Sequence, residues 1–129
     1  MANFYGSYIG FGSDATGGVP AFAYQGESYG YAAGGASPSA VDIIDRYSFT
    51  SDIDATSVAN LPSAQSGLSE CGCVSDTYGY LLSSWPNGAA IYKNDFASDG
   101  DSTSVGDATI SKSDSSGSSS LTHGYWAGG

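Results

Sequence analysis

The sequence repeats with a period of about 47 residues, and this repeat limits the possible folds more than any other feature. Residues 44–58 align with residues 91–105 without a gap. Identical residues stand at Ile44/Ile91, Phe49/Phe96, Ser51/Ser98, Asp52/Asp99, Asp54/Asp101, Thr56/Thr103, Ser57/Ser104 and Val58/Val105. A repeat of this length is typically one supersecondary unit that stacks on its neighbours to bury its apolar face.

A second element occurs three times, in residues 28–31, 77–80 and 122–125. Each copy places a glycine between two rings, with Tyr or His before it and Tyr after it. Residues two apart lie on the same face of a strand. The first and third copies lead to a diglycine, Gly34-Gly35 and Gly128-Gly129, which indicates a turn or a close approach of two backbones.

Strands and turns account for the rest of each repeat. The chain has 19 Gly and 10 Tyr, and it offers no long segment free of Gly and Ser in which a helix could form. Residues 43–49 and 91–96 predict strands, and residues 55–61 and 102–110 predict the strands that return from them. The segment Ser98-Asp99-Gly100-Asp101 predicts a tight hairpin turn, because Asp-Gly tolerates positive φ. We therefore expect an all-β fold.

About four short antiparallel strands in 40 to 50 residues are typical of a β-propeller blade. We assign residues 1–26 to an N-terminal anchoring arm and residues 27–129 to two propeller-like repeats, about 27–76 and 77–129. Two blades alone would leave their inward faces exposed to solvent. We therefore expect a ring closed by homo-oligomerisation, in which three chains give six blades. Residues 121–129 form a spare strand that could complete a blade of the neighbouring chain.

The charge of the chain excludes several partners. The formal net charge is -10, and Arg46, Lys93 and Lys112 are the three basic residues. So few cations cannot neutralise a row of phosphates, and we expect neither nucleic acid nor an anionic membrane as a partner. The sequence has no apolar run of spanning length, and its N-terminus lacks the features of a signal peptide, which predicts synthesis in a cytoplasm.

No group of residues predicts catalysis, a cofactor or a metal centre, and the chain is predicted not to be an enzyme. His123 could be imagined in a hydrolase triad, but the sequence contains no Gly-x-Ser-x-Gly nucleophile elbow. Cys71 and Cys73 are one residue apart, a spacing that would strain a disulfide and that favours thiols or contacts with another chain. Residues 111–120 form a Ser-rich tract, and we expect an ordered surface loop there.

The acidic pairs Asp52/Asp54 and Asp99/Asp101 have two interpretations. Their carboxylates could bind Ca²⁺ together with carbonyls of the turn. Asp also forms turns through hydrogen bonds to nearby backbone groups. The turn is favoured, because no bidentate Glu follows either pair.

Four aromatic residues form the candidate ligand or partner surface: Tyr31, Tyr80, Tyr125 and Trp126. They could stack on sugars, with acidic side chains accepting hydrogen bonds from sugar hydroxyls. Aromatic residues at a spacing of two are more often the packed face of a strand. Packing is the favoured interpretation.

The unit that runs from Phe96-Ala97-Ser98-Asp99 to Val105-Gly106, and then through residues 118–129, carries a resemblance. It resembles the glycine- and tyrosine-rich, kelch-like repeats of structural proteins of tailed bacteriophages, particularly phages of marine bacteria and cyanobacteria. The resemblance covers about residues 27–129. The opening segment, residues 4–12, also resembles the start of such proteins. The resemblance implies a virion structural protein of the tail-fibre or capsid-decoration type.

The leading hypothesis is therefore a homo-oligomer, a trimer, located in the virion as an assembly and adhesion module. Its N-terminal arm would bind other virion proteins through Phe4, Tyr5, Tyr8 and Phe11. The alternative is a carbohydrate-binding propeller lectin, in which the four aromatic residues contact a glycan of the host surface.

Overall fold

The structure, a computed structural model, describes residues 28–66, 72–83, 88–112, 114–120 and 122–129. These residues contain strands and no helix, so none of their segments is a long apolar helix that could span a membrane. The strands are β1 (Tyr29–Ala33), β2 (Val41–Ser48), β3 (Thr56–Gln65), β4 (Gly72–Val74), β5 (Tyr78–Leu82), β6 (Ala90–Asp95), β7 (Thr103–Asp107), β8 (Ser115–Ser119) and β9 (Gly124–Gly128). The expectation of an all-β fold is confirmed.

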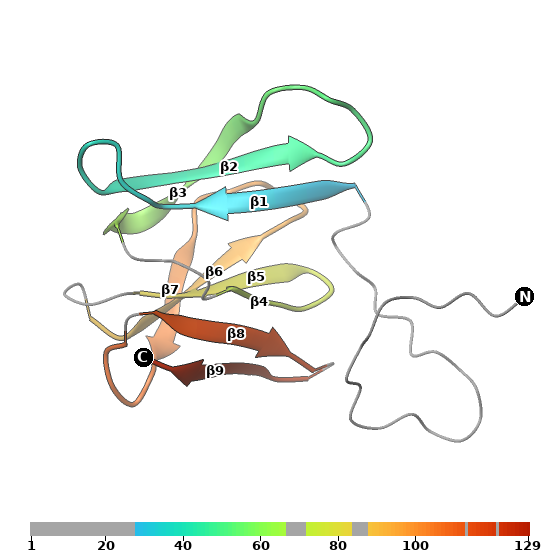
Figure 1. Ribbon diagram of the computed structural model, residues 1–129. Helices are drawn as coiled ribbons and strands as arrows, with labels where there is room; N and C mark the ends of the chain where they lie inside the picture. The colour runs from blue at the N-terminus through green and yellow to red at the C-terminus, as the bar shows by residue number, and fades with distance from the viewer. Residues whose placement is uncertain (1–27, 67–71, 84–87, 113, 121) are drawn as a thin grey trace, which may run out of the picture.

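The strands form three antiparallel sheets that lie one above another (Figure 1). The first sheet has the order β1-β2-β3, the second β4-β5-β6-β7 and the third β8-β9. The first sheet contacts the second through β3 and β7, and the third contacts the second beneath β4. The second sheet is therefore the middle layer, covered on one face by the first sheet and on part of the other face by the third.

Strand pairing in the first two sheets follows the sequence repeat residue by residue. The equivalent pairs are Tyr31–Arg46 and Tyr80–Lys93, then Ile44–Ala59 and Ile91–Gly106, then Arg46–Thr56 and Lys93–Thr103. Even the register shift recurs, between Ile44 and Asp45 in one sheet and between Ile91 and Tyr92 in the other. A one-residue slip would turn every side chain to the opposite face, so equal registers give equivalent residues equivalent orientations.

Each sequence repeat contributes strands to two sheets. β4 belongs to the first repeat, but it pairs with β5 of the second, with Cys73 opposite Tyr80. In the same way β8 pairs with β9, with Ser118 opposite Tyr125. β4 and β8 thus occupy equivalent positions, each beside a strand with the Tyr-Gly-Tyr or His-Gly-Tyr pattern.

The apolar core lies between the first and second sheets. Ile44, Ala59, Leu61 and Tyr92 are buried there, and Tyr31 and Leu81 pack against them. Alternation along β2 explains this arrangement, because Ile44 points inward with 1% of its surface exposed while Ile43 points outward with 39% exposed. The outer face of the first sheet remains uncovered by the other described strands.

Buried polar groups also join these two sheets. The amide oxygen of Gln65 accepts a hydrogen bond from the Ser83 hydroxyl at 3.3 Å, and both residues are fully buried. The hydroxyls of Ser63 and Tyr92 are hydrogen-bonded at 3.0 Å. Satisfied polar groups in a core fix the relative position of the layers, because any displacement would leave them unpaired.

Two expectations about local structure are wrong. The Ser-rich tract 111–120 contains strand β8 at Ser115–Ser119, which forms because β9 and β4 give its backbone and its buried Ser115 a place to pack. The segment around Asp99 and Gly100 is a longer loop, since β6 ends at Asp95 and β7 begins at Thr103. Asp99 itself has a positive φ of 48°, and Asp95 Oδ1 accepts a hydrogen bond from the Ala97 amide.

Candidate assembly surfaces

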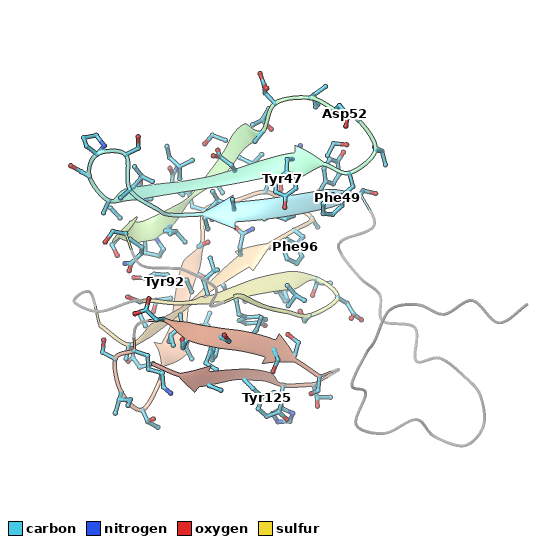
Figure 2. All side chains as sticks on the ribbon, viewed as in Figure 1. Tyr47, Phe49, Asp52, Tyr92, Phe96 and Tyr125 are labelled. Atoms are coloured by element: carbon cyan, nitrogen blue, oxygen red, sulfur yellow. The ribbon has the colours of Figure 1, made fainter. Side chains whose placement is uncertain are left out.

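The loop between β6 and β7, residues 96–102, reaches out of the second sheet and contacts the first; we name it the second-repeat loop. Phe96 leads this contact, with its ring centroid 4.9 Å from that of Tyr31. Figure 2 shows Phe96 between the first and second sheets. The ring also lies over Gly79, where an added Cβ would come within 3.0 Å of Phe96 Cζ. Phe96 is thus held between a tyrosine of one sheet and a glycine of the other, and the glycine leaves room for the ring.

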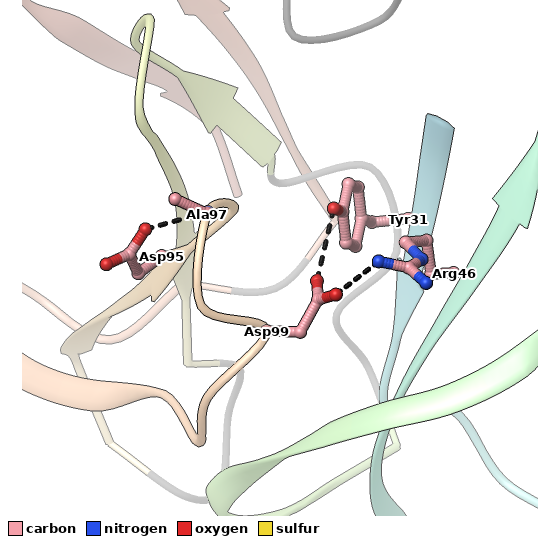
Figure 3. A network of polar contacts seen from close by, with 5 residues as sticks. All are labelled: Tyr31, Arg46, Asp95, Ala97 and Asp99. Carbon is pink, nitrogen blue, oxygen red and sulfur yellow. Dashed lines mark hydrogen bonds and ion pairs between the residues drawn. The ribbon is translucent and has the colours of Figure 1, made fainter. Parts of the chain in front are cut away.

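An ion pair stands beside this ring contact. The carboxylate of Asp99 pairs with the Arg46 guanidinium and accepts a hydrogen bond from the Tyr31 hydroxyl at 3.3 Å (Figure 3). The two charged side chains are only 29% and 24% exposed, so water screens their attraction less than at an open surface. Burial, followed by the negative charge of Asp99, raises the pKa of Tyr31 above its usual value.

Asn60 of β3 forms the third part of the contact. Its backbone amide donates to Asp101 Oδ1 at 2.8 Å, and its side-chain amide donates to the same oxygen at 3.2 Å. Its carbonyl accepts from the Ser102 amide at 2.9 Å. The second-repeat loop is therefore fixed to the first sheet at an aromatic, a charged and a backbone position, one on each of β1, β2 and β3.

The equivalent loop of the first repeat, residues 49–55, has no sheet above it among the described residues; we name it the first-repeat loop. Phe49, the counterpart of Phe96, is 53% exposed, and its ring contacts only Tyr47 among the aromatic pairs (centroids 5.5 Å apart). Asp52, the counterpart of Asp99, is exposed, and Ile53 is 67% exposed. Figure 2 shows Asp52 on the loop above the end of β2, whereas Phe96 lies below β1.

The lower face of the second sheet has the same side chains that receive the second-repeat loop on the first sheet. Arg46 lies over the ring of Tyr29 at 4.5 Å, and Lys93 lies over the ring of Tyr78 at the same distance. Tyr80 follows Tyr78 on that face, as Tyr31 follows Tyr29. The third sheet lies beneath β4, while every residue of β7 is exposed. Within the part of the chain that the structure describes, a cation-bearing face equivalent to the first thus remains open beside β6 and β7.

Strand β9 is the counterpart of β1 in conformation as well as in sequence. Gly34 and Gly35 have φ of 65° and 109°, and Gly128 and Gly129 have φ of 83° and 100°. β1 pairs with β2 along one edge, whereas β9 pairs only with β8 among the described strands. The edge of β9 that corresponds to the β2 side of β1 is therefore open to another strand.

The four predicted aromatic residues do not form one surface. Tyr31 packs against Phe96, and Tyr80 is half-buried under the second sheet. Tyr125 is 55% exposed on the outer face of the third sheet, with the His123 ring 6.3 Å away. Trp126 is its neighbour on β9 and points to the opposite face, where it is half-buried. Tyr31 is therefore packed between two sheets, whereas the Tyr125 ring is exposed to solvent.

Cys73 lies between the second and third sheets. It is 2% exposed, and its thiol donates to the carbonyl oxygens of Ser118 (3.3 Å) and Tyr125 (3.4 Å). The residues of the predicted anchoring arm, Phe4, Tyr5, Tyr8 and Phe11, and also Cys71, lie outside the described residues. The described part of the chain contains no group of three or more His, Cys, Asp or Glu side chains placed to hold a metal ion.

Sequence reasoning missed the basic residues of these surfaces. Arg46 and Lys93 occupy the same position of the two repeats, and each lies over the ring of a tyrosine on the neighbouring strand. The signal was available, because a chain with three cations places two of them at one aligned position. Comparison with protein-family models and with curated proteins finds no match to this chain.

Proposed function

We propose that this chain is a structural protein that assembles with copies of itself into a symmetric homo-oligomer and serves as a building block of a virion. The resemblance to kelch-like structural proteins of tailed bacteriophages supports the tail-fibre or capsid-decoration role. The acidic composition suits a solvated outer surface. The N-terminal arm, residues 1–26, would attach the assembly to other virion proteins.

One observation carries the assembly part of the proposal. The chain has a second copy of each of the two surfaces that form its internal sheet-to-sheet contact, and these second copies do not contact each other. The second-repeat loop is docked on the first sheet, whereas the first-repeat loop and the part of the second sheet's lower face beside β6 and β7 are open among the described residues. Exposed apolar side chains that are grouped together, such as Phe49 and Ile53 of the first-repeat loop, typically mark interaction sites. Repeated sheets of this kind support a propeller-like ring.

Ring geometry follows from the number of sheet positions that each chain fills. β1-β2-β3 and β4-β5-β6-β7 are two such positions, and β8-β9 begins a third that the next chain would complete. Each chain then advances the ring by two sheets. A trimer would give a ring of six sheets, the size expected for a closed propeller.

The test is the solution mass of the purified chain by light scattering over a wide concentration range, beside a variant that lacks residues 121–129. The proposal predicts a trimer that dissociates on truncation, because β9 is lost. Circular dichroism of the truncated variant checks that its remaining sheets stay folded. A full-length chain that is monomeric at every concentration would contradict the proposal.

A glycan array with the full chain and with Tyr125→Ala separates architecture from carbohydrate binding. Tyr125 is the exposed ring that a sugar could reach on the third sheet. Strong glycan binding that disappears in Tyr125→Ala, from a chain that does not oligomerise, would replace the structural role with a lectin.

A further inference from the structure

We propose that copies of this chain join head to tail, with the first-repeat loop of one copy docked on the lower face of the second sheet of the next. This inference rests on the proposed assembly function and names the surfaces that perform it. In the joint, Phe49 of one copy contacts Tyr80 of the next, and Asp52 pairs with Lys93. Both contacts reproduce ones that the chain already makes within itself.

The internal contact supplies the template. Phe96 stacks on Tyr31 at 4.9 Å, and Asp99 binds both Arg46 and the Tyr31 hydroxyl. The pairing registers of the first and second sheets are the same, so Tyr80 and Lys93 have the orientations of Tyr31 and Arg46. A loop with the spacing of Phe96 and Asp99 therefore fits both faces, and the first-repeat loop has that spacing at Phe49 and Asp52.

Charge selects a second copy as the occupant. The chain carries a net charge of -10, so two copies repel each other overall, and an acidic group opposite a basic one determines where they can meet. Arg46 is already paired with Asp99, whereas Lys93 lies over Tyr78, beside a fully exposed β7. Asp52 is the one acidic residue that the repeat places where Lys93 needs a partner. The contact is heterologous, and such contacts form rings when the rotation closes.

The open edge of β9 completes the joint. Beside β1, strand β2 pairs Arg46 with Tyr31 and Tyr47 with Gly30. β9 offers Tyr125 and Gly124 at the same spacing, followed by the same diglycine conformation. In the joint, β9 of the copy that receives the loop takes the place of β1 and pairs with β2 of the copy that supplies the loop, in register Tyr125 opposite Arg46. Strand β1 of that copy is released from β2, and Tyr125 takes over the position of Tyr31. Strand exchange of this kind brings the first-repeat loop to the lower face of the second sheet.

One position of the joint departs from the template, and it sharpens the test. Asp107 stands where the first sheet has Asn60. Asn60 donates two hydrogen bonds to Asp101, but a carboxylate at Asp107 would repel Asp54 of the incoming loop. Asp107→Asn restores the donor and removes the repulsion, so it should strengthen association of the copies.

The experiment measures the dissociation constant of the oligomer by sedimentation equilibrium for five proteins: the wild type, Asp52→Lys, Lys93→Asp, the double variant Asp52→Lys/Lys93→Asp, and Asp107→Asn. Each single charge reversal should weaken association at least about tenfold, because it places like charges in the joint. The double variant should recover most of the loss, and Asp107→Asn should associate more tightly than the wild type. Thermal unfolding of each variant checks that the changes have not unfolded the monomer.

Asp42→Lys is the matched control for Asp52→Lys, because Asp42 is an exposed acid of β2 that lies before the residues paired with β1. It should change association less than Asp52→Lys does. A wild-type oligomer that tolerates both single reversals would overturn this inference and leave the proposed assembly intact. A wild-type monomer at every concentration would overturn both.

Discussion

The hydroxyl of Tyr31 donates a hydrogen bond to the carboxylate of Asp99, a residue of the neighbouring sheet, at 3.3 Å. Arg46 binds the same carboxylate. The first two sheets are therefore joined by one acidic group that serves a phenol and a guanidinium together.

The first prediction concerns pH. Burial and the charge of Asp99 raise the pKa of Tyr31 above 10.0, so the folded chain holds this proton more tightly than the unfolded chain does. The Tyr31 contribution to the free energy of unfolding is therefore complete below pH 10 and is lost as the pH rises above it. Tyr31→Phe should lose stability less steeply as the pH rises above 10, as measured by urea unfolding at each pH. Equal slopes would contradict the assigned pKa shift.

The second prediction separates the internal contact from its exposed counterpart. Asp99→Asn removes the charge but keeps a residue that tolerates the φ of 48°. The lost pairing with Arg46 and Tyr31 should lower the free energy of unfolding by about 1–2 kcal/mol. Asp52→Asn, in the exposed first-repeat loop, should change it by less than about 0.5 kcal/mol. Urea unfolding of both variants at a concentration where the chain is monomeric gives the comparison.

The third prediction concerns the join between the second and third sheets. A Cβ on Gly124 would lie 3.0 Å from Cys73 Cβ and 3.2 Å from its Sγ. Because Cys73 is buried and cannot move aside, Gly124→Ala should destabilise this join by about 1–3 kcal/mol. Gly72→Ala on β4 is the control, since nothing lies within 4 Å of its Cβ.

The thiol of Cys73 reports the result directly. In a Cys71→Ser background, alkylation of Cys73 should be slow in the parent chain, because the thiol is 2% exposed. The rate should rise in Gly124→Ala and remain unchanged in Gly72→Ala. Rapid alkylation of the parent would show that the third sheet does not cover Cys73.

The fourth prediction uses two neighbouring isoleucines of β2. Ile44→Ala opens a cavity in the core and should cost about 2–4 kcal/mol of unfolding free energy. Ile43→Ala, on the outer face with 39% of its surface exposed, should cost less than about 1 kcal/mol. Equal losses would mean that the alternation of β2 has been assigned to the wrong faces.

Strand positions and even strand registers follow from the repeat, because Ile44 and Ile91 align and pair with Ala59 and Gly106 in the same way. The Ser-rich strand β8 could not be predicted from its own residues. Ser and Gly have weak strand propensity, and Ser115–Ser119 becomes a strand through its partners β9 and β4. The residues of β8 themselves do not indicate these contacts with strands that are distant in the sequence.

The candidate surfaces, too, could be predicted from the sequence only in part. Tyr31, Tyr80 and Tyr125 could be placed on equivalent faces from spacing alone. Their different exposures depend on which sheet lies beneath each one, which no local pattern reveals. The partnership of Arg46 with Asp99 joins residues 53 positions apart, and the sequence shows it only as two repeated charges.

The strand pairing is out of step with the sequence repeat, because β4 ends one repeat and lies at the edge of the next sheet. Duplicating one period, for example at the segment between β4 and β5, would therefore supply all four strands of an additional layer and leave the existing layers intact. Recombination could lengthen or shorten such a chain in whole layers without creating an unpaired strand. The number of layers per chain is thus a quantity that evolution or an engineer can change while each contact between neighbouring layers is kept.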